Sequence, residues 1–415
     1  MADTNTAAAY MAIARKWRPR TLEEMVGQTH VTRTLRNALS SGRIHHAFLF
    51  TGARGVGKTT TARALARALN CDQGPTIEPC GVCPPCVDIL AGNSPDVIEI
   101  DGASNNSVED IRDLRDGVRY LPTRGRFKIY IVDEVHMLSK GAFNALLKTL
   151  EEPPPHVKFI FATTEVNKIP ETILSRIQRF DFKRIPVKTV IGRLRHICDA
   201  ESVKISDDAL RMVASAGEGS MRDAQSLLDQ VISFGGQEPT DAQVADILGM
   251  VDRTLLYDLL GGLIGNKPGQ ALDAIARVHE HGYELSQLTN ELLELVRNAA
   301  LVALSEDARK HLDVPEEEKA RLAALVSGVP AEQLARTFHV LLEVHDQVAR
   351  SSRPRYVLEM AIARLMAIRP AEPLGNLVDR MVDIEKRLRG SGVSPRPPGA
   401  RREPGDDMEG ERRRP

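Results

Sequence analysis

The 415-residue chain has few aromatic residues, a single tryptophan and almost no net charge. Its 55 lysines and arginines are balanced by 56 aspartates and glutamates, so any contact with nucleic acid must come from local basic patches. The chain has no apolar run long enough to cross a membrane, and residues 1–10 lack the apolar core of a signal peptide. We therefore expect a cytoplasmic protein without membrane contact, folded into about two to four domains.

Cysteine is also scarce, with five in the chain, and four of them stand within sixteen residues. Cys71, Cys80, Cys83 and Cys86 follow the pattern C-x8-C-x2-C-x2-C among prolines and glycines. Such crowding in a cytoplasmic chain favours a structural zinc site, because four thiolates complete a tetrahedron and leave no position for water. Free thiols and a redox pair are the alternatives. Cys198 stands alone and is predicted to be a small buried hydrophobic residue.

The most specific motif lies within residues 48–69. An apolar, strand-like run at 48–51 is followed by a loop that fits G-x-x-x-x-G-K-[ST] and then by a helical pattern. Glycines in such a loop let backbone amides turn toward phosphate oxygens, and the helix N-terminus adds partial positive charge. Lys58 is expected to contact the β- and γ-phosphates and Thr59 to hold Mg²⁺. The predicted phosphate-binding residues are Gly52, Ala53, Arg54, Gly55, Val56, Gly57, Lys58, Thr59 and Thr60. A glycine-rich turn that merely precedes a helix is the alternative.

An acidic pair supplies the second half of the predicted nucleotide site. The apolar run 127–132 reads as a buried strand of a parallel sheet and ends in Asp133 and Glu134. Ligands of open α/β sheets bind at the carboxyl ends of strands. Asp133 is predicted to complete the Mg²⁺ shell, and Glu134 to polarise the water that attacks the γ-phosphate. The next strand, 158–162, is followed by Thr164, whose hydroxyl would bond that water or the γ-phosphate.

Two arginines and an aromatic segment are further candidates for nucleotide binding. Arg176 and Arg222 suit phosphoryl transfer, because the guanidinium binds phosphate bidentately and stays charged; solvated surface groups are the alternative. The segment 10–19 carries Trp17 among cationic residues. Two interpretations are equally compatible with it: the segment covers an adenine base, or a buried Trp17 anchors the N-terminal segment to the fold.

The C-terminal half carries helical patterns without polar chemistry of its own. Ser206 and Thr240 are predicted to be helix N-caps. Residues 244–368 are almost entirely helical in pattern, and a helical domain of this kind favours an assembly module over a second active site. Beyond Pro370, apolar residues keep heptad spacing for only about two heptads. Residues 391–415 are rich in proline, glycine and arginine and are predicted to be disordered.

Taken in succession, these motifs resemble the gamma/tau ATPase subunits of the bacterial DNA polymerase III clamp loader. The resemblance runs from about residue 10 to residue 370 and is specific, because a zinc knuckle after the P-loop helix is not expected of AAA+ ATPases in general. The segments that carry it are 14–19, 26–28, 42–47, the P-loop, the four cysteines, 133–138 and 143–153.

This resemblance implies an α/β AAA+ domain, a parallel sheet with helices on both faces, followed by a small helical lid and an all-α collar. We expect a nucleotide-binding domain at 1–184 with the zinc knuckle at 71–86, a lid at 185–243, a collar that joins subunits at 244–369, and a linker with a disordered tail at 370–415. Thr164 matches the polar sensor of the family, Arg176 the arginine finger that enters a neighbour's ATP site, and Arg222 the lid arginine that senses the γ-phosphate.

The implied activity is ATP hydrolysis within the DNA-directed DNA polymerase III holoenzyme, with ATP, Mg²⁺ and structural Zn²⁺ as ligands and no polymerase site in this chain. The implied partners are other clamp-loader subunits, a sliding clamp and primed DNA, with the replicative polymerase and helicase bound through a longer form. Two rival hypotheses remain. The sequence Asp133-Glu134-Val135-His136 also fits a helicase box and hence a DNA-translocating motor, and a scaffold subunit would carry a weak ATP site.

Overall fold

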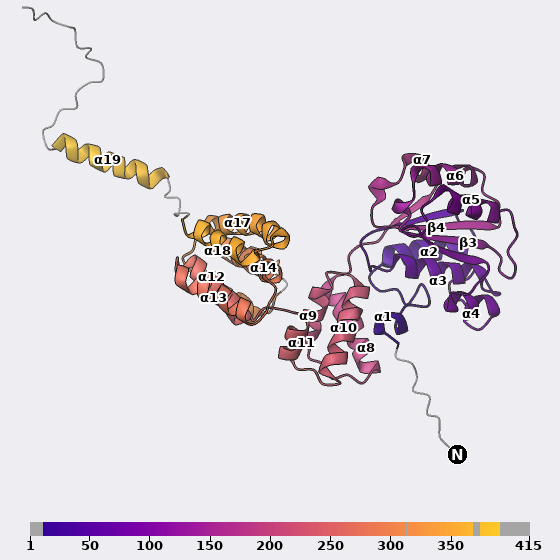
Figure 1. The fold of residues 1–415 in the computed structure, drawn as a ribbon, viewed down its shortest axis with the longest axis horizontal. Coiled ribbons are helices and arrows are strands. Elements are labelled where there is room, and N and C mark those ends of the chain that lie inside the picture. Colours follow the sequence, from indigo (N-terminus) through magenta and orange to yellow (C-terminus); the bar gives the residue numbers. More distant parts are fainter. Residues whose placement is uncertain (1–10, 313, 368–373, 391–415) are drawn as a thin grey trace, which may run out of the picture. The chain divides into compact units, whose positions relative to one another are not determined.

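The computed structural model describes residues 11–312, 314–367 and 374–390, which fall into two compact units divided between Arg253 and Thr254. Unit 1 comprises the described residues up to Arg253, and unit 2 those from Thr254 onward (Figure 1). Each unit is described by itself. No helix among the described residues combines the length and apolar character needed to cross a membrane.

A five-stranded parallel sheet organises the first part of unit 1, with the strand order β2-β3-β4-β1-β5. The strands are β1 (Ala47–Thr51), β2 (Val97–Asp101), β3 (Lys128–Asp133), β4 (Val157–Thr163) and β5 (Gln178–Asp181). The predicted strands at 48–51, 127–132 and 158–162 are thereby confirmed to within a residue at either end. β5 was not expected, because its sequence Gln-Arg-Phe-Asp lacks an apolar pattern.

Helices cover both faces of this sheet, as the resemblance implies. Successive residues of a strand point to opposite faces, so Phe48 and Phe50 of β1 join the core under α2 and α3, while Ala47 and Leu49 join the core under α5 and α6. Figure 1 shows α2 and α3 on one side of the sheet and α5, α6 and α7 on the other. The helices of this part are α1 (Ile13–Lys16), α2 (Thr29–Ser41), α3 (Lys58–Asn70), α4 (Pro84–Ala91), α5 (Val108–Gly117), α6 (Lys140–Glu151) and α7 (Glu171–Leu174), with 3-10 turns η1 (Val135–Met137) and η2 (Val166–Lys168).

Four helices with a core of their own complete unit 1. They are α8 (Val187–Ala200), α9 (Asp207–Ala216), α10 (Met221–Gly235) and α11 (Asp241–Ile247). Their buried face includes Leu194, Leu210 and Leu228, and the short helix α1 packs against α10. The predicted caps are confirmed: the Ser206 hydroxyl accepts from the Ala209 amide, and Thr240 forms a capping box with Gln243.

The regular secondary structure in the described residues of unit 2 is all helical, as the apolar periodicity predicts. It contains α12 (Arg253–Ile264), which begins at the division, α13 (Pro268–Glu280), α14 (Leu285–Leu304), α15 (Glu306–Arg309), α16 (Glu316–Leu325), α17 (Ala331–Arg350), α18 (Pro354–Ala367) and α19 (Leu374–Gly390). The long helices α14 and α17 pack against each other, and α18 packs against α17 and α13.

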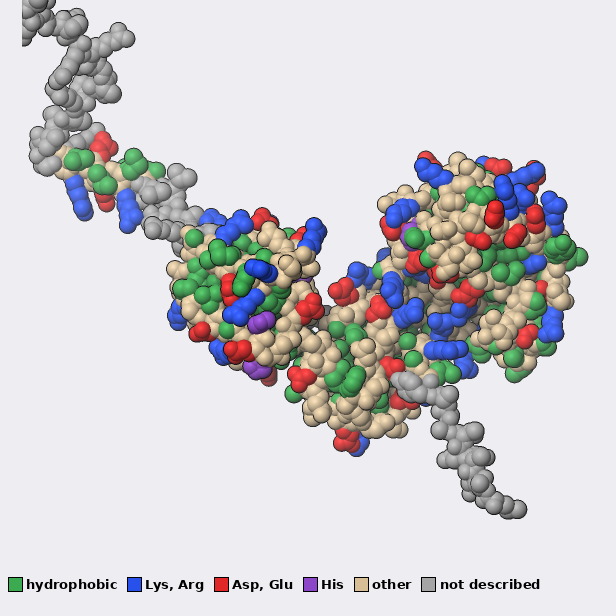
Figure 2. All heavy atoms as spheres, viewed as in Figure 1, with side chains coloured by type: hydrophobic (Ala, Val, Ile, Leu, Met, Phe, Trp, Pro, Cys, Tyr) green, Lys and Arg blue, Asp and Glu red, His purple; other side chains and the backbone are tan. Residues whose placement is uncertain are grey.

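Helix α19 lies where the sequence predicts a linker. Figure 2 shows apolar side chains along one side of this helix and basic ones along the other. Val378, Met381 and Leu388 recur at helical spacing in this segment and are exposed, so the heptad spacing marks an amphipathic helix and not an unstructured segment. The predicted disordered tail at 391–415 lies outside the described residues.

Candidate nucleotide site and metal centre

The phosphate-binding loop joins β1 to α3 and depends on its glycines. Gly52, Gly55 and Gly57 have φ values of 147°, 73° and 102°, in the region that residues with a Cβ rarely adopt. A Cβ on Gly52 would lie 2.3 Å from the Phe182 carbonyl oxygen, and one on Gly57 would lie 2.6 Å from Met25 Cε. Only glycine therefore fits, and the loop backbone can approach a ligand closely.

Lys58, which follows the loop, is placed where it can bind a phosphate. Lys58 is buried, and its Nζ donates to the carbonyl oxygens of Gly52 at 2.9 Å and Ala53 at 2.8 Å. Burial lowers the pKa of Lys58, while the charges of Glu134 and Asp133 oppose that shift. Among the described residues this ammonium is bound only to the two loop carbonyls, an arrangement that fits an anionic ligand.

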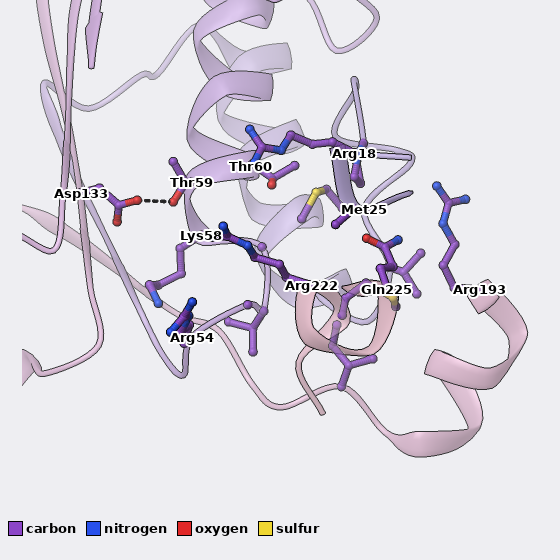
Figure 3. Close-up of a pocket in the computed structure, with 18 of the residues that line it drawn as sticks. Arg18, Met25, Arg54, Lys58, Thr59, Thr60, Asp133, Arg193, Arg222 and Gln225 are labelled. Carbon is purple, nitrogen blue, oxygen red and sulfur yellow. Dashed lines mark hydrogen bonds between the residues drawn. The ribbon is translucent and has the colours of Figure 1, made fainter. Parts of the chain in front are cut away.

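Thr59 and Asp133 form the other half of this arrangement. The Thr59 hydroxyl donates to Asp133 Oδ2 at 2.6 Å, across from the carboxyl end of β3 (Figure 3). A hydroxyl and a carboxylate side by side are oxygen ligands of the kind that Mg²⁺ takes beside nucleotide phosphates. These residues therefore fit the predicted metal.

Glu134 and Thr164, which are thirty residues apart, are in direct contact. The Thr164 amide and hydroxyl both donate to Glu134 Oε2, at 3.2 and 3.1 Å. His136 Nδ1 lies 3.3 Å from the same carboxylate oxygen, and its Nε2 lies 3.3 Å from Glu165 Oε1. The predicted base and the predicted sensor thus form one cluster, oriented by a buried histidine.

A cavity of about 390 Å³ opens beside the loop and is rich in cations. The four helices α8 to α11 are called the lid here. Figure 3 shows Arg222 and Gln225 of α10 and Arg193 of α8 reaching the cavity from the lid, and Lys58, Thr59 and Thr60 reaching it from α3. Burial, followed by the charge of Arg63, lowers the pKa of Arg18, which also lines the cavity. The lining holds five basic side chains and two carboxylates, and this excess of positive charge suits a polyphosphate. The lining residues are Ala14, Arg18, Pro19, Met25, Val26, Arg54, Gly55, Val56, Gly57, Lys58, Thr59, Thr60, Asp133, Glu134, Ile185, Arg193, Met221, Arg222 and Gln225.

Sequence reasoning missed two of these polar residues. Gln225 lies one turn after Arg222 on α10, so the helical spacing could have identified it. Arg193 on α8 carries no local signal, because only the packing of the lid brings it to the cavity.

Trp17 does not line the cavity. Its ring lies edge-on to His196 at 5.6 Å, and its Nε1 donates to Glu201 Oε1 at 2.7 Å. Of the two alternatives for segment 10–19, the packing one therefore describes Trp17, although its side chain is partly and not fully buried. Its neighbours Arg18 and Pro19 reach the cavity.

Arg176 lies after α7, outside this cavity. Its Nη1 donates to the Thr172 carbonyl oxygen at 2.6 Å and to Ser175 Oγ at 3.1 Å, and its Nη2 donates to Glu151 Oε1 at 2.7 Å. The structure thus brings Lys58, Glu134, Thr164 and Arg222 into one neighbourhood but leaves Arg176 apart.

The four crowded cysteines converge, with all four Sγ atoms within 4.8 Å of one another. The Cys80 amide donates to Cys71 Sγ and the Cys83 amide to Cys80 Sγ, both at 3.4 Å. Backbone amides of Val82 and Cys83 lower the pKa of Cys80 to about 6, and burial raises the pKa of Cys86 to about 12. Four converging sulfurs fit a structural Zn²⁺.

Cys198 is buried in the lid core, as predicted, and burial raises its pKa to about 11.

The parallel sheet, the phosphate loop after β1, the acidic pair after β3 and the helical lid define the class: an AAA+ nucleotide-binding fold. Three family models then match along the chain. "DNA polymerase III, delta subunit" covers residues 27–186, "DNA polymerase III clamp loader subunit, ATPase lid domain" residues 189–237, and "DNA polymerase III subunits gamma and tau domain III" residues 240–380. The chain belongs to the gamma/tau subunit family of DNA polymerase III.

Curated relatives support this membership over most of the chain. DNA polymerase III subunit tau of Escherichia coli K12 is 44% identical over 88% of this chain and 57% of its own length. Subunit tau of Bacillus subtilis is 42% identical over 86% of this chain and 63% of its own length, and subunit gamma/tau of Mycobacterium tuberculosis H37Rv is 40% identical over 95% and 70%. The chain thus spans a little over half of the Escherichia coli protein.

Among solved structures, the Thermotoga maritima RuvB Holliday junction branch migration motor matches with a TM-score of 0.42 and 19% identity, over 60% of this chain and 79% of that one. This likeness is too distant to bear on function.

Proposed function

We propose that the chain is an ATPase subunit of the DNA polymerase III clamp loader, which uses ATP binding and hydrolysis to load a sliding clamp onto primed DNA. One observation carries the proposal: Lys58, Thr59, Asp133 and Glu134 line a single cavity that the lid closes with Arg222. The proposal includes the domain limits 1–184, 185–243 and 244–369 and the tail at 370–415, a cytoplasmic location, and ring assembly with other loader subunits.

In the proposed site, Lys58 and Arg222 bind the β- and γ-phosphates, and the amides of residues 52–60 surround them. Thr59 and Asp133 would hold Mg²⁺, which supplies charge compensation for the phosphates. Glu134 accepts the proton of the water that attacks the γ-phosphorus, and ADP leaves with the electron pair of the broken P–O bond. Thr164 keeps the Glu134 carboxylate in position through two hydrogen bonds.

The proposal gives Arg176 a role in the site of a neighbouring subunit. Its guanidinium lies outside the cavity of its own chain, so it would act only across a subunit boundary. ATP between Lys58 of one subunit and Arg176 of the next would tighten the assembly, and loss of the γ-phosphate would remove that stabilisation.

The four cysteines would hold Zn²⁺ as a structural cross-link of the loop at 71–86. Matches named for clamp-loader subunits favour this function over a translocating motor. An inert scaffold is disfavoured by the complete set of Lys58, Thr59 and Glu134 in one cavity.

The test is steady-state ATPase turnover with partner loader subunits, a sliding clamp and primed DNA. The clamp and DNA together should stimulate turnover, and Arg176→Ala should abolish the stimulation while nucleotide binding survives. Arg179→Ala is the matched control, because this nearby arginine pairs with Asp181 outside the cavity. Turnover that ignores clamp and DNA would overturn the proposal.

A further inference from the structure

Arg176 is held in place before any neighbour arrives, and the only acidic side chain that holds it is Glu151, among the residues that the structure describes. We propose that Glu151 is a positioning residue for Arg176, which fixes the guanidinium in the orientation that completes the ATP site of the adjacent subunit. This inference rests on the proposed function, because it needs a finger that acts between subunits.

The arrangement joins the ends of two packed helices. Glu151 is the last residue of α6, and Arg176 follows the end of α7 by two residues. These helices lie side by side in Figure 1 and are in contact. The hydrogen bond from Arg176 Nη2 to Glu151 at 2.7 Å therefore connects Arg176, which follows α7, to the end of a different helix, α6.

The remaining bonds fix the plane of the guanidinium. Both partners of Nη1, the Thr172 carbonyl oxygen and Ser175 Oγ, come from the arginine's own segment. Without Glu151, only Nη1 of the guanidinium would have hydrogen-bond partners in this structure, and the group could rotate about the Arg176 side-chain bonds. Arginine carries five N–H donors, and three are used by the bonds to Thr172, Ser175 and Glu151. The other donors have no acceptor among the described residues and are available to a phosphate.

The charge balance favours positioning over inhibition. Glu151 contacts one guanidinium nitrogen only, and about half of its side chain is exposed, so solvent screens most of the neutralising effect. Solvent does not cancel the effect of the hydrogen bond on the orientation of the Arg176 guanidinium in the same way. A long flexible side chain contributes more to catalysis when its geometry is fixed beforehand. An exposed ion pair also adds little to folding stability, so removing the Glu151 charge should affect turnover more than folding.

The neighbouring residue Glu152 provides a matched control. It is exposed like Glu151, and its side chain makes no hydrogen bond or ion pair within the part of the chain that the structure describes. Glu151→Ala and Glu152→Ala therefore remove the same carboxylate from adjacent positions, but only the first removes the acceptor of Arg176 Nη2. Alanine is used because a glutamine would keep an oxygen that can accept this bond.

The experiment uses mixed assemblies of two full-length variants with partner loader subunits, clamp and primed DNA. One variant, Arg176→Ala, keeps an intact nucleotide site but lacks the finger. The other, Lys58→Ala, supplies a finger but has no working site. Hydrolysis in the mixture then reports fingers donated in trans. Adding Glu151→Ala to the Lys58→Ala chain should lower kcat of the mixture by about tenfold with little change in KM, and Glu152→Ala should leave both unchanged.

The outcomes separate the two ideas. If Lys58→Ala does not restore turnover to Arg176→Ala, the finger does not act in trans, and the proposed function fails at that point. If it does restore turnover but Glu151→Ala donors restore it equally well, Glu151 is not a positioning residue. A rise in kcat with Glu151→Ala would also overturn the inference, because it would mean that Glu151 restrains the finger. Glu151→Asp, which retains the carboxylate, should recover part of the loss.

Discussion

At the scale of single residues, the contact between Glu134 and Thr164 gives the catalytic hypothesis its sharpest test. A glutamine in place of Glu134 keeps an oxygen that can accept from Thr164 but cannot take up a proton. Glu134→Gln should therefore lower kcat by about 100-fold or more while nucleotide affinity is retained. Single-turnover hydrolysis with a parallel nucleotide-binding titration checks this prediction. Hydrolysis at an undiminished rate would mean that another group takes the proton.

Residues whose role is local were predictable, and residues whose role depends on packing were not. Gly52, Gly57, Lys58 and Thr59 form a continuous motif whose chemistry follows from spacing alone. Gln28 shows the contrast: it is fully buried, and its side chain bridges to Lys183 through a 2.7 Å bond to the carbonyl oxygen and a 3.2 Å bond from the amide. A buried polar side chain needs such a partner, but nothing in the sequence near Gln28 predicts that the partner is Lys183.

At the scale of elements, the knuckle that holds the four cysteines should depend on its metal. The protein should contain about one Zn²⁺ per chain, and Cys83→Ser should lose it and unfold at a lower temperature. Helix α4, which carries Cys86, packs on α3, so the loss should also loosen the helix that follows the phosphate loop. Metal analysis and thermal unfolding measure both effects. Cys198→Ala should keep its zinc, and a wild-type protein that is stable without metal would contradict the prediction.

The docking of α1 on the lid should be pH-dependent. The hydrogen bond from Lys16, together with that from Trp17 Nε1, lowers the pKa of Glu201 below its usual 4.5. A lowered pKa stabilises the folded state above pH 4.5, and this contribution is lost as the pH falls through the folded-state value. It should be about 1 kcal/mol, since Lys16 is half exposed.

Trp17 is the only tryptophan in the chain, so its fluorescence reports this contact directly. An emission change is expected on acidification below pH 4.5, and Glu201→Gln should show altered emission at neutral pH and no such acid transition. An identical acid response in Glu201→Gln would assign the change to another group.

Elements with a strong apolar period were predicted well, and marginal ones were not. β1 and β4 are buried along their whole length, and such strands appear in the sequence as continuous apolar runs. β5 is short and largely polar, and it is a strand because it pairs with β1, not because its own composition favours one. For α19, two heptads were too little to distinguish a helix from a linker.

At the scale of the whole molecule, the division between Arg253 and Thr254 separates the nucleotide chemistry from the helical remainder. Every residue that lines the nucleotide cavity, and each of the four clustered cysteines, belongs to unit 1. In the proposed function, unit 2 serves assembly. A chain that ends at Arg253 should therefore bind ATP with a Kd within about threefold of the full chain, since a cavity retains its affinity when its lining is intact.

The same shortened chain should hydrolyse ATP at least about tenfold more slowly, because no neighbour is held close enough to supply its Arg176. Sedimentation velocity and ATPase assays over a range of protein concentrations measure assembly and turnover together. Arg176→Ala provides the internal control: it should be silent in the shortened chain and damaging in the full one. If the shortened chain assembles and hydrolyses like the full chain, subunit contacts lie within unit 1, and unit 2 must have a different role.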